Sequence, residues 1–251
     1  MNNPSDDNPS KKNPPESPVD INGARGQSVI MRNMLVVVLA FTSGFIDALS
    51  FLGLGVFASV QTGNTVLLGL AIGSGKIFQA LVSLAAITGY IGGVALGARI
   101  VDPIPVPPKI WSIAITKALI IEVLVLSLLA IVGFSAGGKP SGLILYTLIA
   151  LATVAMGIQG AAVRALGVSD ISTTYITGTW TGLISGLVRQ HHPTASGKKR
   201  VETRLQAAVL IVYVLAAIAG GVAVTNWLVK ATIIPVISIG LVIAVARFRM
   251  N

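Results

Sequence analysis

An all-α membrane protein that crosses the bilayer several times is the fold class that this sequence predicts. Three observations predict it: 53% of the 251 residues are hydrophobic, only 11% are charged, and the mean hydropathy is +0.83. The charged residues lie mostly in the N-terminal tail and between long apolar runs, as they do in polytopic membrane proteins. We therefore expect a multi-pass protein of the inner (plasma) membrane.

The charge and the cysteine count exclude other classes. The formal net charge is +9, but the basic residues stand at the ends of apolar segments and form no basic face interleaved with aromatic residues. Nucleic-acid binding is therefore not expected. The chain has no cysteine, which rules out disulfides and thiolate metal sites.

Residues 1–32 are rich in proline, asparagine and serine and show no apolar period, which predicts a disordered cytoplasmic tail. Residues 33–249 are expected to form a single transmembrane domain. A secretory signal is not expected, because the first apolar run begins at Met34 and no small-residue cleavage pattern follows it.

Eight apolar segments approach the roughly 17 to 25 residues that span a membrane. They are 34–52, 56–74, 78–100, 110–134, 143–163, 171–188, 205–229 and 231–246. The last is short and contains Pro235, and without it the count would be seven, with the C-terminus on the opposite side.

The basic residues orient these segments, because cytoplasmic loops carry an excess of Lys and Arg. With eight crossings and a cytoplasmic N-terminus, the outer side receives only Arg99, Lys109, Arg164 and Lys230. The cytoplasmic side then receives Arg25, Arg32, Lys76, Lys139, Arg189, Lys198, Lys199, Arg200, Arg204, Arg247 and Arg249. Both termini are therefore expected in the cytoplasm.

The second and sixth segments are broken by polar, helix-weakening residues. The interruptions are Thr62-Gly63-Asn64-Thr65 and Thr177-Gly178-Thr179-Trp180. Irregular backbone at membrane depth survives only where protein or a water-filled cavity covers it. Corresponding broken segments in two halves of a chain indicate a binding site near the bilayer midplane.

Ordered matches between the halves predict two pseudo-repeats, about 34–134 and 143–248. Four crossings in each half would make these repeats parallel. The matches are Gly44 and Ala48 with Gly157 and Ala161, Thr62-Gly63 with Thr177-Gly178, and Gly92-Gly93-Val94-Ala95 with Gly220-Gly221-Val222-Ala223.

Two alternatives stay open for the polar residues of these segments. Asp47 in the first span must face the interior or water, either as a coupling or substrate site or as a carboxylate that only hydrogen-bonds the broken helix. The polar groups around Gly63 either meet a ligand or hold the bundle together. The candidate substrate or coupling residues are Asp47, Gln61, Thr62, Gly63, Asn64, Thr65, Thr177, Gly178, Thr179 and Trp180.

Other features carry weaker signals. Lys117 and Glu122 differ by about 140° around a helix, so they are not a pair, and Glu122 needs a partner that the sequence does not name. A stripe at Gly89, Gly93 and Gly97 favours packing inside the monomer over a homo-oligomer seam, although a homo-oligomer is compatible with it.

An enzyme is not expected, because both histidines are adjacent in a loop and no HExxH or nucleotide-binding motif occurs. The sequence thus indicates no catalytic residues, no metal site and no cofactor.

Three short motifs resemble the signature of the YoaK-like membrane proteins, a bacterial and fungal family of unknown function. They are Gly44-Phe45-Ile46-Asp47-Ala48, then Val56-Phe57, and then Thr62-Gly63-Asn64-Thr65-Val66-Leu67-Leu68-Gly69. The resemblance runs from about residue 34 to 249. It implies a polytopic inner or plasma membrane protein, often drawn with six or seven spans, and supplies no substrate or activity.

The leading hypothesis is a secondary transporter or facilitator of a small, amphipathic molecule, with a midplane site between the two broken helices. Trp180 replaces Thr65 in the second half, so one wall of such a site would be polar and the other aromatic. The rival is a membrane scaffold or lipid-interacting protein whose basic loop, 189–204, binds the anionic leaflet. The expected partners are therefore membrane lipid and an unidentified small molecule.

Overall fold

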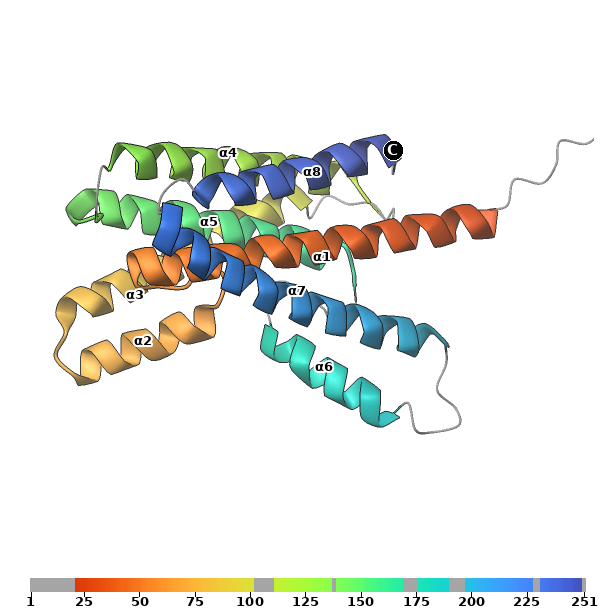
Figure 1. Cartoon of the computed structure of the whole chain (residues 1–251), viewed down its shortest axis with the longest axis horizontal. Helices are drawn as coiled ribbons and strands as arrows, with labels where there is room; N and C mark the ends of the chain where they lie inside the picture. Colours follow the sequence, from red (N-terminus) through yellow and green to blue (C-terminus); the bar gives the residue numbers. More distant parts are fainter. Residues whose placement is uncertain are drawn as a thin grey trace, which may run out of the picture.

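Eight helices and no strand make up the described part of the chain (Figure 1). The structure is a computed structural model that describes residues 21–101, 111–136, 139–168, 176–189, 197–227 and 231–249. The helices are α1 (Ile21–Leu54), α2 (Gln61–Gly73), α3 (Ile77–Val101), α4 (Ile113–Ser135), α5 (Gly142–Ala165), α6 (Ile176–Arg189), α7 (Gly197–Trp227) and α8 (Ile233–Arg249). The all-α polytopic fold class is therefore confirmed.

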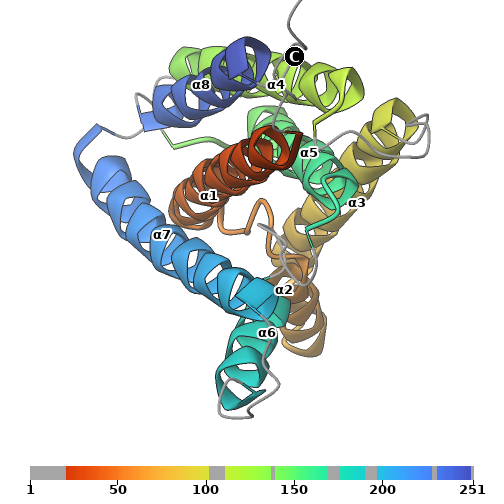
Figure 2. The same ribbon diagram turned by 90° about the vertical axis from the view of Figure 1, so that its right-hand side faces the viewer.

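Five helices are long and apolar enough to cross a membrane, namely α1, α3, α4, α5 and α7. α8 has 17 residues, the lower limit of a span at about 17, and packs against α1 and α4 (Figure 2). α1 begins at Ile21 and so includes part of the stretch expected as a tail. It can do so because the last proline before it is Pro18. Residues 1–20 lie outside the described residues.

Two hydrogen bonds show that α1 and α5 run antiparallel. Near the start of α1, Arg32 Nη1 donates to the carbonyl oxygen of Leu166 at 3.4 Å, just beyond the end of α5. Further along α1, the carbonyl oxygen of Leu39 accepts from Gln159 Nε2 at 3.1 Å. Positions that rise along α1 therefore meet positions that fall along α5.

Close glycine contacts show two parallel pairs, α3 with α5 and α1 with α7. The contacts advance together along both helices of each pair: Gly89 lies against Ala150, Gly97 against Ile158, Gly44 against Tyr213, and Gly220 against Ala48. The stripe at Gly89, Gly93 and Gly97 thus packs inside the monomer, against α5.

α2 points in the same direction as α1, although it follows α1 directly in the chain. It packs against α3 after a tight turn at Gly75, where φ is 68°, and α3 runs opposite to α1. The connector 55–60 must therefore turn back into the bundle. It begins at Gly55, where φ is 80°, and Ser59 lies beside Asp47, about two turns before the end of α1. The segment 55–73 thus turns back into the helix bundle and ends at the same end of the bundle at which it begins.

α6 has the corresponding arrangement at the opposite end of the molecule. In Figure 1 it begins near the middle and ends near the start of α7, where Gly186 lies against Thr203. With 13 and 14 residues, α2 and α6 measure about 20 Å, too short for a hydrocarbon core of about 30 Å. Helices therefore form at both predicted places but do not cross, and the arrangement fits the alternative of six spans. Residues 171–175 lie outside the described residues.

Because α2 and α6 do not cross, the basic residues are distributed differently from the eight-crossing expectation. Arg99 and Arg164, expected opposite Arg32, lie at the same end as Arg32, and Lys76 and Lys139 lie at the other end. Of the basic residues whose side chains the structure describes, this basic end carries Arg32, Arg99, Lys117, Arg164, Arg200, Arg204, Arg247 and Arg249. The start of α1 and the end of α8 both lie there (Figure 1).

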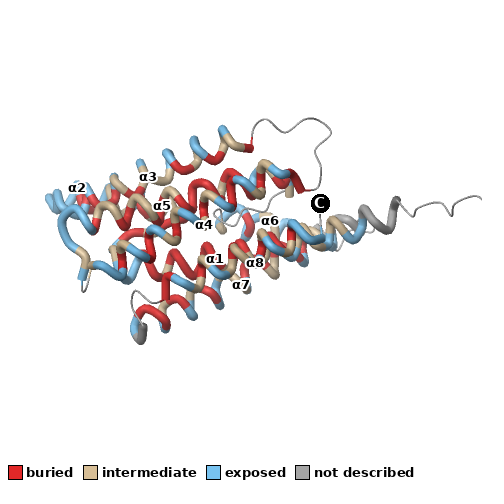
Figure 3. Tube along the Cα trace, turned by 90° about the horizontal axis from the view of Figure 1, so that it is seen from above, coloured by how far each residue is buried: buried red, intermediate tan, exposed pale blue. Residues whose placement is uncertain are grey.

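The core lies between α1, α4, α5, α7 and α8, whereas α2 is largely exposed (Figure 3). Gly93 and Gly157 allow α3 and α5 to touch, because a Cβ at either position would come within 2.3 and 2.5 Å of a backbone oxygen of the other helix. This close packing fixes the rigid frame on which the re-entrant segment is held.

Candidate functional site

Asp47 is the centre of a buried polar cluster that joins α1, the connector 55–60 and α7. Its side chain is 3% exposed. Oδ1 accepts a hydrogen bond from the backbone N–H of Ser59 at 2.7 Å, and Oδ2 accepts from the hydroxyl groups of Ser59 and of Tyr213, the latter at 2.7 Å. The carboxyl group thus holds the connector at membrane depth and ties it to a helix 166 positions away in the chain. This geometry matches the structural alternative for Asp47.

Asn64 and Gln61 close the connector onto the first turn of α2. Asn64 is fully buried, and its Oδ1 accepts from the backbone N–H of Phe57 at 2.9 Å. Its Nδ2 donates to the carbonyl oxygen of Phe57 at 2.7 Å and to Gln61 Oε1 at 2.9 Å. Gln61 Nε2 in turn donates to the carbonyl oxygen of Ala58 at 3.0 Å. These side-chain amides hydrogen-bond to backbone N–H and C=O groups that have no partner in a helix, as irregular backbone inside a membrane requires.

The remaining candidates of the first half lie around the same turn. Thr62 and Thr65 are exposed, and the Thr65 hydroxyl donates to the carbonyl oxygen of Gln61 at 2.8 Å. Gly63 lies against the ring of Phe57, where a Cβ would come within 2.8 Å of a ring carbon. Glycine is needed here because the ring covers the start of α2.

The candidates of the second half lie in the first turns of α6. Thr177 and Gly178 are exposed, Thr179 is buried, and Trp180 is 50% exposed. In the described residues α6 packs against α7 and α2 against α3, and the two short helices do not pack against each other. The structure therefore brings Asp47, Gln61 and Asn64 together and leaves the α6 residues as a separate group.

Two further buried polar contacts were not found by sequence reasoning. Gln159 Nε2 on α5 donates to Ser43 Oγ on α1 at 2.8 Å. The hydroxyls of Thr42 on α1 and Ser238 on α8 share a hydrogen bond of 2.7 Å. The sequence signal for the first contact was the polar amide of Gln159 inside an apolar segment. Gln159 stands next to Gly160, the position that matches Asp47 in the second half. Both contacts fasten α1 to the second half of the chain.

Glu122 is the second buried acid of the membrane core. It lies on α4 with no exposed surface, and neither carboxyl oxygen has a hydrogen-bond partner. Asp47, by contrast, accepts three hydrogen bonds. The described residues thus hold one satisfied and one unsatisfied acid at membrane depth.

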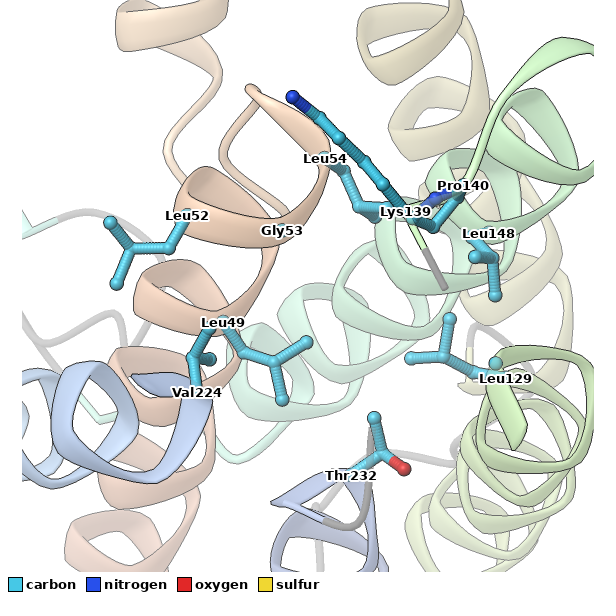
Figure 4. A pocket seen from close by; sticks show the side chains of 11 residues that line it. Leu49, Leu52, Gly53, Leu54, Leu129, Lys139, Pro140, Leu148, Val224 and Thr232 are labelled. Carbon is cyan, nitrogen blue, oxygen red and sulfur yellow. The ribbon is translucent and has the colours of Figure 1, made fainter. Parts of the chain in front are cut away.

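A cavity of about 340 Å³ lies near the end opposite the basic end, where α1 and α4 finish; Figure 4 shows its lining side chains. Its walls are almost entirely apolar and come from α1, α4, α5 and α7, with Lys139 and Thr232 as polar groups. The lining residues are Leu49, Leu52, Gly53, Leu54, Leu129, Gly133, Lys139, Pro140, Leu148, Val224 and Thr232. Such a cavity suits a small molecule that is apolar over most of its surface.

These features define a polytopic membrane protein with a re-entrant polar segment and an internal cavity. The sequence profile of a family described as "Protein of unknown function (DUF1275)" matches residues 35–246. The chain is 32% identical over 222 residues to the UPF0700 transmembrane protein YoaK of Bacillus subtilis (strain 168). The aligned residues make up 88% of this chain and 96% of that protein. The chain therefore belongs to this family, as its motifs predicted. No solved structure matches it.

Proposed function

We propose that the protein is a secondary transporter or facilitator that moves a small amphipathic molecule across the cytoplasmic membrane. The observation that carries this proposal is the pair of half-length helices, α2 and α6, which begin part-way along the molecule and end at its opposite ends (Figure 1). Interrupted helices of this kind form the substrate sites of many secondary transporters. The proposed role is transport rather than catalysis.

The packing of the helices supports an inverted repeat. In such a repeat α1, α2, α3 and α4 correspond to α5, α6, α7 and α8. The contact between α1 and α7 then corresponds to the contact between α5 and α3, and the contact between α2 and α3 corresponds to that between α6 and α7. All four contacts are present. Each half crosses three times, through α1, α3 and α4 or through α5, α7 and α8. An odd number of crossings gives the halves opposite orientations, so the repeats would be inverted rather than parallel.

The glycine contacts give the register of this repeat. Gly44 lies against the backbone oxygen of Tyr213, and Gly157 against that of Tyr90. In an inverted repeat the third helices would then correspond through Tyr90 and Tyr213, in place of the double glycines in the sequence.

The cavity indicates the class of substrate. Its apolar walls favour a hydrocarbon or aromatic body, and Lys139 at its rim favours a polar or anionic end. The starts of α2 and α6 do not line this cavity, but they carry the positive ends of the helix dipoles and so favour an anionic group at those places. An amphipathic acid of low molecular weight fits these features.

The basic end is proposed to face the cytoplasm, because Lys and Arg accumulate on that side of membrane proteins. Both termini of the described chain would then be cytoplasmic, and the cavity would open to the outside. The inner (plasma) membrane is the proposed location.

The test is an aqueous path to the starts of the half-helices. Since the chain has no cysteine, a single introduced cysteine reports one position. We expect Thr62→Cys and Thr177→Cys to react with water-soluble thiol reagents in intact membranes. The matched control is Leu124→Cys, on the exposed face of α4, which lipid should protect.

A ligand screen then names the substrate. Purified protein is heated with small acids and other amphipathic compounds, and a ligand at 100 times its Kd should stabilise it by about 2.7 kcal/mol. Protected cysteines at positions 62 and 177, together with no stabilising ligand, would contradict transport.

The rival role is a lipid-interacting scaffold, and exposed Arg200 and Arg204 at the start of α7 favour it. Basic residues beside a membrane helix bind anionic lipid headgroups. Arg200→Gln with Arg204→Gln should then weaken binding to phosphatidylserine liposomes, whereas unchanged binding would count against this role.

A further inference from the structure

Glu122 is fully buried, and no group in the described part of the chain hydrogen-bonds to its carboxyl oxygens. Neither of its carboxyl oxygens has a hydrogen-bond partner, and its neighbours along the same face of α4, Leu119 and Leu126, are fully buried. An ionised carboxylate in such surroundings is very costly, so the side chain is a neutral acid in this conformation.

No base or cation compensates for Glu122 from the helices packed around it. α4 is packed against α3, α5 and α8. The charged or titratable groups on the described parts of these helices are Tyr90 and Arg99, Tyr146 and Arg164, and Arg247 and Arg249. α4 itself also carries Lys117, which is about 140° away from Glu122 around the helix. None of them hydrogen-bonds to Glu122. All four arginines lie at the last turns of their helices, at the basic end of the molecule.

The buried positions of α4 share their spacing with those of α8, where the matching residue is apolar. The buried positions of α8, which are 235, 239, 242 and 246, repeat the spacing of 115, 119, 122 and 126 on α4. Val242 takes the place of Glu122 in that pattern. The spacing of the buried positions therefore does not by itself require a carboxyl group.

Glu122 lies on the same buried face of α4 as two residues that line the cavity. Leu129 and Gly133 line the cavity on the same buried face of α4, and Leu129 is about two turns, or roughly 10 Å, from Glu122. Leu126 stands between them. Leu126 is fully buried, so a proton path between the acid and the cavity requires Leu126 to move.

We propose that Glu122 is a proton-binding site that takes up and releases its proton through the cavity and so couples transport to protons. This inference rests on the proposed transport function. A proton suits the site better than a metal ion, because metal ions need several oxygen ligands and the described residues offer no such group.

The test is infrared spectroscopy of the protein in liposomes while the pH is raised. The parent protein should lose the carbonyl band of a neutral carboxylic acid, and Glu122→Gln should lack that band entirely. Glu202→Gln, which removes a less buried acid on α7, and Asp47→Asn are the controls, and both should keep the band.

A parent protein without a titrating band, or the same band in Glu122→Gln, would overturn the proposal. If Glu122→Gln fails to fold, the parent protein is treated with dicyclohexylcarbodiimide, which reacts with protonated acids in apolar surroundings. Peptide mass spectrometry should then place the adduct on Glu122, and its absence there overturns the proposal as well.

The two proposals fail separately. A titrating Glu122 in a protein without an aqueous path or ligand would support the proton site and contradict transport. Ligand flux that keeps its pH dependence in Glu122→Gln would overturn only the coupling.

Discussion

Asp47 shows how a single acid can define a re-entrant segment. It accepts hydrogen bonds from a backbone N–H, a serine hydroxyl and a tyrosine hydroxyl. Outside a membrane, water would provide the acceptor that such an irregular turn needs. Its position in the sequence predicted a buried polar role. The partner Tyr213 could not be predicted, because nothing in the local sequence of either residue records their proximity.

Asp47→Ala should destabilise the protein by about 1 to 3 kcal/mol, because it leaves the Ser59 N–H without an acceptor in a buried place. Asp47→Asn should cost less, since the amide oxygen still accepts from Ser59 and the hydroxyl groups can rotate to accept from the amide nitrogen. Thermal unfolding in detergent measures both, and equal stability of the two variants would contradict the role given to Asp47.

Asn64→Asp should be at least as harmful as Asn64→Ala. The aspartate keeps the acceptor for the Phe57 N–H, but it places a second oxygen against the carbonyl of Phe57 where Nδ2 now donates. Accessibility of a cysteine introduced at Ser59 should rise in both variants. If the cysteine at position 59 stays inaccessible in Asn64→Asp, the side-chain amide of Asn64 does not hold the turn.

At the scale of the element, glycine spacing decides which helices meet. Gly93 faces a backbone oxygen of α5, whereas its neighbour Gly92 points away from all other helices. The small-residue stripe predicted close packing correctly, and the structure adds the partner, α5. The choice of α5 could not come from the stripe, since such patterns fit any flat helix face.

Gly93→Ala should destabilise the protein by about 1 to 3 kcal/mol or more, because its Cβ would lie 2.3 Å from the oxygen of Val154. Gly92→Ala meets nothing within 4 Å and should be neutral or stabilising by up to about 1 kcal/mol. Unfolding temperatures of the two neighbours provide a matched comparison, and similar losses in both would refute the packing of α3 on α5.

The breaks at Gly63 and Gly178 located both short helices, but their direction could not be predicted. Hydropathy records how long an apolar segment is and not whether the chain reverses inside it. The reversal depends on Gly55 and on the bond from Ser59 to Asp47, and neither has a signature in composition. The basic residues between the two breaks, Lys76, Arg99, Lys139 and Arg164, were consequently assigned to the wrong end.

At the scale of the whole molecule, the re-entrant segments set the side on which each loop lies. A cysteine at Ser74 should be labelled from outside the cell, and one at Arg164 from the cytoplasm, because α2 does not cross. Eight crossings would give the reverse result for both positions. Labelling with a membrane-impermeant maleimide, before and after permeabilisation, distinguishes the two arrangements.

The pairing of α1 with α7 also constrains how the protein is made. α1 leaves the ribosome early, yet its close partner is a late helix, and α3 must likewise wait for α5. Asp47 therefore stays without Tyr213 until most of the chain has been synthesised. Neither half of the chain can bury its polar groups alone. The connector 55–60 must therefore stay in the bilayer without its partner on α7 until the last third of the chain has been translated.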